Sequence, residues 1–143
     1  MNSFKHRTPI QLRFKDGDLM GHVNNANHFT FFELARVHYF KEVVGEDINW
    51  NREGVIIARM TIDYKLPLLI TDEVYAYTRC SRLGTKSFDI EHCLVVMKQK
   101  EEQTIATGVS TLVCYDYEKK QSVDIPNLWR NMMSEYDGLS LGE

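Results

Sequence analysis

Residues 16–33 read Asp16-Gly-Asp-Leu-Met-Gly-His-Val-Asn-Asn-Ala-Asn-His-Phe-Thr-Phe-Phe-Glu33, and this stretch decides both the fold and the function predicted for the chain. Its first half is too polar and too glycine-bearing to be a strand, whereas from Asn27 onward it has the pattern of a helix. It holds two carboxylates, Asp16 and Asp18, together with two histidines and three asparagines. A buried loop seldom carries so many hydrogen-bonding side chains, because each one without a partner costs about 1–3 kcal/mol. We therefore expect the functional site here.

A carboxylate a few residues before a helix suits chemistry on a carbonyl group. The first N–H groups of a helix have no partner within the helix and lie at its positive end, so they stabilise a developing oxyanion. Asp18 would then act as a nucleophile or as a general base for water; the alternative is that it caps the loop or the helix. We expect a structural role for Asp16, while His22 either orients Asp18 or a water, or hydrogen-bonds within the loop.

The composition limits the class of protein. The chain has 143 residues, of which 43% are hydrophobic and 26% charged, as expected for one globular domain. Its net charge of −3 gives no basic surplus for nucleic acid or an anionic membrane. Residues 1–10 show no apolar signal segment, and no run reaches the roughly 18 apolar residues of a membrane span. Cys80, Cys93 and Cys114 match no zinc spacing and indicate reduced thiols, so we expect a soluble, cytoplasmic protein.

A long helix is predicted from about Asn25–Asn27 to Val44, with Gly45 as its C-terminal glycine. One side of this helix is fully apolar, and the opposite side mixes apolar residues with charged ones. The apolar stripe consists of Phe32, Ala35, Tyr39 and Val43. A helix that is apolar on more than half of its circumference must be covered by its own sheet or by a partner subunit.

The remainder of the chain has the alternation of strands, with a short helix predicted near the end at Pro126. The predicted strands are Thr8–Phe14, Val55–Leu66, Glu73–Ser81, Ser87–Gln99 and Gln103–Tyr115. Long strands joined by short turns favour an antiparallel, curved sheet. One helix cannot cover both faces of five strands, so we expect an α+β fold in which the sheet wraps around the helix and subunits pair. No repeat or linker divides residues 1–143, which predicts one domain.

The segment from Phe14 to Glu33 resembles the signature of the hotdog-fold acyl-CoA thioesterases of the 4-hydroxybenzoyl-CoA thioesterase type. The resemblance extends from about Leu12 to Pro126 and includes Asp63-Tyr-Lys-Leu-Pro67, Asp72-Glu-Val74 and Gly84-Thr-Lys-Ser-Phe88. It implies a hotdog fold with a five-stranded antiparallel sheet around one helix. It also implies homodimers with a continuous sheet, or homotetramers, and an active site at the dimer interface that hydrolyses acyl-CoA thioesters.

The resemblance assigns roles to individual residues. It makes Asp18 the catalytic acid, with the backbone N–H at or near Asn25 polarising the thioester carbonyl; His22 is a further catalytic candidate, which would orient Asp18 or a water. Gly21 is expected to contact substrate, and His28 and Phe32 are expected on the acyl side, although core packing is the alternative for the aromatic residues. Cations at the site mouth would hold the CoA phosphates, and the candidates, which could equally be solvated surface residues, are Lys65, Arg82, Lys86 and Ser87.

No metal and no cofactor are expected. His22 and His28 lie six residues apart, a spacing that does not place two ligands on one helix face, and no cysteine spacing completes a site. His28 is expected to line the acyl pocket or the interface rather than to act as a base. Most members of the family have tyrosine at the position of His28, and arginine or another polar residue is common at that of Thr30. These departures concern the acyl pocket more than the chemistry.

Three other functions share the fold. A thioesterase that takes acyl-carrier protein would need a basic patch at the entrance, against which the net charge of −3 argues mildly. A non-catalytic acyl-CoA-binding or sensing module would not need Asp18 at the scissile bond. A hotdog dehydratase carries its histidine and acid in a different motif. The sequence leaves open the acyl group, the choice between dimer and tetramer, and whether Asp18 is a nucleophile or a general base.

Overall fold

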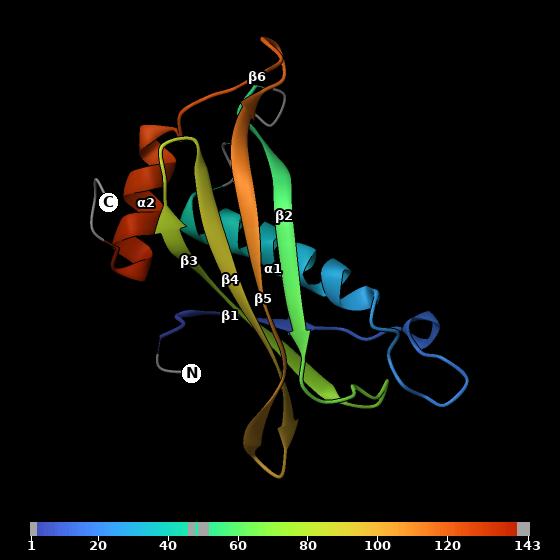
Figure 1. The fold of residues 1–143 in the computed structure, drawn as a ribbon. Coiled ribbons are helices and arrows are strands. Elements are labelled where there is room, and N and C mark those ends of the chain that lie inside the picture. Colours follow the sequence, from blue (N-terminus) through green and yellow to red (C-terminus); the bar gives the residue numbers. More distant parts are fainter. Residues whose placement is uncertain (1–2, 46–47, 49–51, 140–143) are drawn as a thin grey trace.

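The computed structural model describes residues 3–45, 48 and 52–139, and Figure 1 shows a long helix lying across one face of an antiparallel sheet. The elements in chain order are β1 (His6–Ile10), the 3₁₀ turn η1 (Phe14–Asp16), α1 (Asn27–Val43), β2 (Gly54–Tyr64), β3 (Glu73–Leu83), β4 (Ser87–Lys98), β5 (Glu101–Asp116), β6 (Gln121–Ser122) and α2 (Asn127–Asp137). The predicted order of a strand, a long helix, four long strands and a short helix is confirmed. The two-residue β6 is too short to leave a pattern in the sequence.

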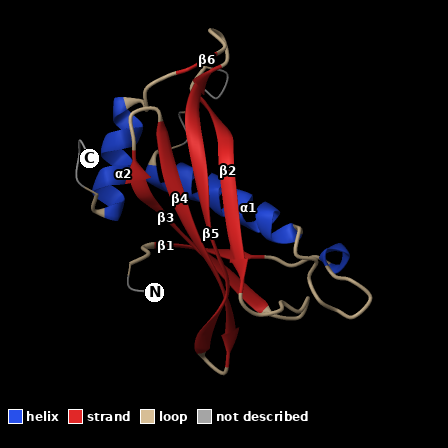
Figure 2. Ribbon diagram, in the orientation of Figure 1, coloured by secondary structure: helices blue, strands red, loops and turns tan. Residues whose placement is uncertain are grey.

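The strands follow the order β1-β3-β4-β5-β2, and β6 pairs with the end of β5. Every pairing is antiparallel (Figure 2). The β4–β5 hairpin turns through Gln99 and Lys100, whose φ angles of 53° and 67° are left-handed. The two edges of the sheet differ in length, because β1 has 5 residues and contains Pro9 while β2 has 11.

The prediction for the first strand was wrong in its position, which is His6–Ile10 rather than Thr8–Phe14. The inward residues of β1 include the polar His6 and Thr8, so hydrophobic alternation does not reveal them. Phe14, predicted on the buried face, is 91% exposed and begins η1. The chain turns there because the Asp16 carboxylate accepts the Arg13 N–H at 2.8 Å, which caps the turn.

The predicted apolar stripe of α1 is confirmed, because all of its members are buried against the sheet. Phe31 and Phe40, on the mixed side, are buried as well, whereas Leu34 and Val37 are about half exposed. The sheet therefore covers most of the helix circumference but leaves one flank open.

Two hydrophobic clusters lie along α1. The cluster at its N-terminal half joins Phe32 and Ala35 to Ala76, Leu94 and Ala106 of the sheet. The cluster at its C-terminal half is built around Tyr39 and Phe40 and is closed by α2, which contributes Trp129 and Met133. Pro126 directly precedes α2, as the sequence predicts, and Gly138 ends that helix with a left-handed φ of 71°.

The helix and the sheet pack tightly at Gly108 of β5. The Phe32 ring, which is fully buried, stacks on His92 with centroids 4.5 Å apart and planes at 9°. A Cβ atom at Gly108 would lie 2.8 Å from this ring and 2.5 Å from the Thr61 carbonyl oxygen. Only glycine fits there, because the carbonyl belongs to the paired strand β2 and cannot turn aside.

Replacing Gly108 with alanine is expected to destabilise the fold by about 1–3 kcal/mol, the usual cost of overpacking. Chemical unfolding measures this loss. Thr107→Ala, one residue away on the other face of β5, is the matched control and should change the unfolding free energy by only about 0.5 kcal/mol. Equal effects of the two substitutions would contradict the account of the close approach.

Candidate active site

The loop before α1 is a closed hydrogen-bonded unit. Its two arms pair through a bridge between Gly17 and Val23, and the Asp18 N–H donates to the His22 carbonyl at 2.7 Å. The tip turns at Gly21, whose N–H donates to the Asp18 carbonyl at 3.1 Å and whose φ of 76° favours glycine. Gly21, expected to contact substrate, thus has a structural reason to be glycine.

The Asp18 carboxylate is fixed through one of its two oxygens. Oδ1 accepts the N–H groups of Met20 at 2.8 Å and of His22 at 3.1 Å. Within the described part of the chain, no donor reaches Oδ2, and the residue is exposed. Asp18 therefore caps its loop with one oxygen and presents the other to solvent, so the capping role and the catalytic role are compatible.

Asp16 ties the loop to the helix start. Its side chain is only 1% exposed and accepts hydrogen bonds from the Arg13 backbone and guanidinium, the latter at 2.8 Å. The hydrogen-bonded guanidinium holds the pKa of this carboxyl below its usual range although burial opposes the shift. The Asp16 carbonyl accepts the Asn24 N–H at 2.9 Å and the Asn27 side-chain amide at 3.0 Å. This agrees with the structural role expected from the sequence.

Four of the five backbone N–H groups at the start of α1 have acceptors within the protein. They are Asn24 (to Asp16 O), Ala26 (to Asn24 Oδ1, 3.0 Å), Asn27 (to Asn24 O, 3.0 Å) and His28 (to Asn25 O, 3.2 Å). The N–H of Asn25, an exposed residue, donates to no acceptor among residues 3–45, 48 and 52–139. It is therefore available to a ligand at the positive end of the helix.

His28 is 1% exposed and packs rather than reaching solvent. Burial lowers the pKa of its imidazole, while the carbonyl groups of Asn25 and Asn24 act in the opposite direction. Its ring meets the Tyr64 ring edge to face, with centroids 4.9 Å apart. The other loop histidine, His22, is half-buried and contributes backbone hydrogen bonds to the loop.

Tyr64 was not predicted as a site residue. It ends β2, and its hydroxyl donates to the Asn25 carbonyl at 2.7 Å across 39 residues of sequence. The tyrosine lies within the Asp63–Pro67 segment noted above, but nothing in that segment indicates which distant group the hydroxyl meets.

Three of the four predicted phosphate-binding residues, Arg82, Lys86 and Ser87, lie at the β3–β4 turn. Arg82 donates to Asp89 at 2.9 Å and to Ser87 Oγ at 3.0 Å, and Lys86 lies 3.3 Å from the Asp124 carboxylate. Both cations are substantially exposed, so their present partners do not enclose them.

These residues lie at the opposite end of the molecule from Asp18. The Tyr64 end of β2 touches the start of α1, whereas at the Gly54 end the neighbouring Cys114 N–H bonds to the Lys86 carbonyl. Eleven strand residues at about 3.3 Å each separate the two ends by roughly 30 Å. The structure thus brings together Asp18, Gly21, His22, Asn25 and His28, with Lys65 next to Tyr64, but within one chain it does not bring Arg82, Lys86 and Ser87 to them.

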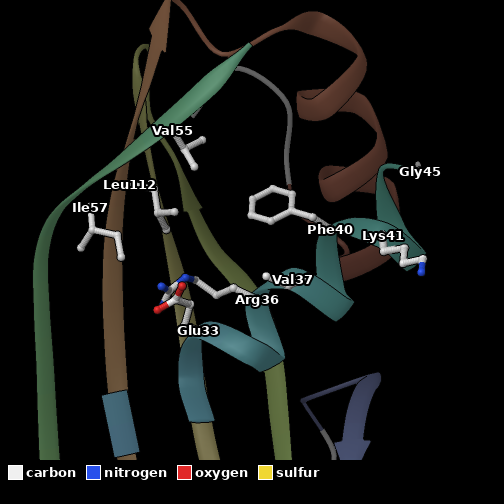
Figure 3. Close-up of a pocket in the computed structure, with 9 residues that line it drawn as sticks. All are labelled: Glu33, Arg36, Val37, Phe40, Lys41, Gly45, Val55, Ile57 and Leu112. Carbon is white, nitrogen blue, oxygen red and sulfur yellow. The ribbon is translucent and has the colours of Figure 1, made fainter. Parts of the chain in front are cut away.

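A cavity of about 610 Å³ opens between α1 and the strands β2 and β5 (Figure 3). Apolar side chains from both sides line it, including Val37, Phe40, Val55, Ile57 and Leu112. Phe32 is not among its lining residues, because it lies in the core. The cavity runs along the open flank of the helix towards the Gly54 end of β2.

A polar network borders this cavity, and it was not predicted from the sequence. Arg36 lines the cavity, is 5% exposed, and donates to Ser110 Oγ at 2.9 Å. The same hydroxyl lies 2.9 Å from His92 Nε2. Burial lowers the pKa of the Arg36 guanidinium, and it lowers the pKa of the His92 imidazole to about 3. Figure 3 shows the Arg36 side chain extending from α1 towards the strands, with its end beside that of Glu33.

Within the part of the chain that the structure describes, no three side chains of His, Cys, Asp or Glu come together as a metal site. No helix among the same residues is both long and apolar enough to cross a membrane.

A long helix across one antiparallel sheet, with an acid-bearing loop immediately before the helix, defines the hotdog class of thioesterase fold. A family model described as the thioesterase-like superfamily matches residues 12–133, and the chain belongs to this superfamily. The predicted hotdog fold and the predicted class of enzyme, a thioesterase, are thereby confirmed.

Several known proteins are similar along almost the whole chain. A thioesterase from Thermus thermophilus, solved with coenzyme A and Zn, aligns with TM-score 0.84 and 32% identity over 99% of this chain and all of that one. The long-chain acyl-CoA thioesterase FadM of Escherichia coli (strain K12) is 23% identical over 90% of this chain and 97% of its own. A 4-hydroxybenzoyl-CoA thioesterase mutant crystallised with 4-hydroxybenzoyl-CoA shares the fold, with TM-score 0.82 and 16% identity over 90% of this chain and 98% of that one.

Asp16→Asn is expected to lower the unfolding free energy by about 1–3 kcal/mol at pH 7, because a charge-assisted hydrogen bond to a buried group is lost. The folded pKa of Asp16 lies below the unfolded value of about 3.9, so its stabilisation is complete above that value and is lost as the pH falls through the folded pKa. Urea unfolding of both proteins should show a difference that is constant from pH 5 to 7 and shrinks below about pH 4.

Asp63→Asn is the control for this experiment, because Asp63 is exposed and its carboxylate accepts no hydrogen bond from the described residues. It should leave both the stability and its pH dependence close to wild type. A difference for Asp16→Asn that grows as the pH falls would contradict the direction of the pKa shift.

Proposed function

We propose that this protein hydrolyses acyl-CoA thioesters to the free acid and CoA, with Asp18 as the reacting carboxylate and the Asn25 N–H as the oxyanion donor. The proposal rests on two groups of one hydrogen-bonded loop that have no partner among the described residues. They are the carboxylate oxygen Oδ2 of Asp18 and the backbone N–H of Asn25. The similarity to FadM, named a long-chain acyl-CoA thioesterase, and to the Thermus thioesterase complexed with coenzyme A supports the choice of substrate.

The chemistry follows from these two groups. The thioester carbonyl accepts the Asn25 N–H, and the helix dipole stabilises the negative charge that develops on its oxygen. As a general base, Asp18 removes a proton from water while the water oxygen attacks the carbonyl carbon; the C–S bond then breaks and the sulfur takes that proton. As a nucleophile, Asp18 displaces the thiolate to form an anhydride, which water hydrolyses to regenerate the carboxylate. Both routes yield one acid and one thiol per water consumed.

A second copy of the chain is proposed to complete the site. β2 pairs with β5 on one side, and no described strand pairs with its other side. Its 11-residue edge carries the exposed Ile56 and Ile57, and a long apolar edge strand of this kind pairs readily with another chain. Two copies related by a twofold axis would pair their β2 strands antiparallel and continue the sheet.

This arrangement would bring the loop that holds Asp18 and Asn25 close to the β3–β4 turn, although the two lie far apart within one chain. An antiparallel β2 pair places the Tyr64 end of one subunit beside the Gly54 end of the other. Asp18 and the Asn25 N–H of one subunit then approach the cavity and the β3–β4 turn of its partner. We assign the cavity to the acyl group and Arg82, Lys86 and Ser87 to the CoA phosphates, which they would bind by charge and hydrogen bonds.

Asp18→Asn is expected to reduce kcat/KM for CoA release by about 100-fold or more, since the amide can neither attack the carbonyl nor accept the proton from water. The assay measures free CoA from short, long and aromatic acyl-CoAs. Asp116→Asn is a matched control, because Asp116 Oδ1 also caps a loop, accepting the N–H groups of Glu118 at 2.9 Å and Lys119 at 3.1 Å. The control should keep wild-type activity.

The outcomes separate the candidate functions. Equal activity of wild type and Asp18→Asn would remove Asp18 from catalysis. Tight binding of an acyl-CoA without any hydrolysis by wild type would favour the sensing module. Hydrolysis of acyl-carrier-protein esters in preference to CoA esters would change the carrier but not the chemistry.

Ile56→Glu is expected to weaken association of the subunits by about 100-fold or more, because it places an unpaired charge in the apolar contact between the two β2 strands. Sedimentation should show a shift from dimer to monomer, and kcat/KM should fall with the dimer fraction. Leu128→Glu on α2, another half-exposed apolar position, is the control and should change neither. A monomeric Ile56→Glu variant with full activity would contradict the two-subunit site.

A further inference from the structure

The N–H of Asn25 is useful as an oxyanion donor only if its direction is fixed, so the contacts that hold this residue bear on catalysis. The peptide group preceding Asn25 is held through the Asn24 carbonyl, which accepts the Asn27 N–H. The peptide group following it is held through the Ala26 N–H, which donates to Asn24 Oδ1, and through the Asn25 carbonyl. Of these groups, the Asn25 carbonyl is the one that accepts a hydrogen bond from a residue of the sheet, Tyr64.

Two donors converge on the Asn25 carbonyl. The His28 N–H, from the first turn of α1, is 3.2 Å away, and the Tyr64 hydroxyl is 2.7 Å away. Apart from the backbone bonds within α1, the other hydrogen bonds described for residues 24–28 are made with residues 16–28, so Tyr64 supplies the side-chain bond that fixes this turn relative to β2. Burial raises the pKa of the Tyr64 phenol, which keeps it a donor at neutral pH.

The Tyr64 ring adds a second constraint. It meets the buried His28 ring edge to face at 4.9 Å and 73°, and His28 contacts Phe31 in turn at 5.9 Å. The hydroxyl and the ring therefore bind the same helix turn at two places, which prevents the turn from rotating about a single hydrogen bond. Tyr64 itself is anchored in the sheet by its pairing with Ala106 of β5.

We propose that Tyr64 is a positioning residue for the thioester hydrolysis described above, holding the Asn25 N–H in the direction of the substrate carbonyl through the Asn25 carbonyl and the His28 ring. This inference rests on the proposed function. Tyr64 does not touch the reacting atoms; it ties the oxyanion donor to the strand at which the second subunit is proposed to pair.

Tyr64→Phe separates the two contacts, because it removes the hydroxyl and keeps the ring. It should lower kcat by about 10-fold, less than the roughly 100- to 1,000-fold loss that follows removal of an oxyanion donor, and should change KM by less than about twofold. Tyr64→Leu, which also removes the ring contact, should lower kcat further. The loss should be the same for short, long and aromatic acyl-CoAs, since the oxyanion forms at the thioester whatever the acyl group is.

Tyr75→Phe is the matched control, because the Tyr75 hydroxyl donates to Glu73 at 2.6 Å on β3 and takes no part in the site. It should leave kcat unchanged. Thermal unfolding and sedimentation of each variant test that the fold and the association of subunits persist. Tyr64 is 43% exposed, so neither of its substitutions should prevent folding.

A second readout does not depend on hydrolysis. In ¹⁵N-labelled protein, the amide resonance of Asn25 should move in Tyr64→Phe and stay in place in Tyr75→Phe. An unmoved Asn25 amide, an unchanged kcat, or a loss that depends on acyl length would each overturn the positioning role. A wild type that hydrolyses no acyl-CoA would instead overturn the proposed function, and the Asn25 amide would still decide whether Tyr64 orients that group.

Discussion

One sheet covers a helix that is apolar around more than half of its circumference, and it leaves one flank of that helix open. This incomplete cover accounts for the main features of the molecule. Strands β3, β4 and β5 cover Phe32, Ala35 and Tyr39 completely, and α2 closes the C-terminal half of the helix. On the β2 side the sheet contacts the start of the helix at Tyr64 but leaves a cavity beside the rest of that flank. The cavity of about 610 Å³ and the unpaired edge of β2 thus have one cause, the open flank of α1.

The fold could be predicted where the side chains follow the period of their element. The stripe from Phe32 to Val43 has helical spacing, and β4 and β5 alternate with period two, so their positions are nearly correct. β1 breaks the rule, because the residues it buries are a histidine, a threonine and an isoleucine. Its outward Pro9 and its short length gave no compensating signal, and the strand was placed two residues too late at its start.

In the candidate site, too, local contacts could be predicted from the sequence and distant contacts could not. Asp18 and Asn25 belong to one loop whose bonds span a few residues, and they were proposed because this continuous stretch resembles the family signature. Tyr64 acts across 39 residues and Arg36 across 74, and no pattern within either segment indicates its partner. Arg82 and Asp18 lie far apart within one chain, because the length of β2 separates them.

The hydrogen bonds of the loop before α1 also fix the number of residues between Asp18 and Asn25. The Gly17–Val23 bridge pairs its arms, and the Asp16 carbonyl holds the Asn24 N–H, so the acid and the donor are joined by a ring of hydrogen bonds as well as by the backbone. One residue added or removed between Asp18 and Asn25 would break that ring and turn the carboxylate away from the helix. The number of residues in this loop therefore sets where the Asp18 carboxylate and the Asn25 N–H lie relative to each other.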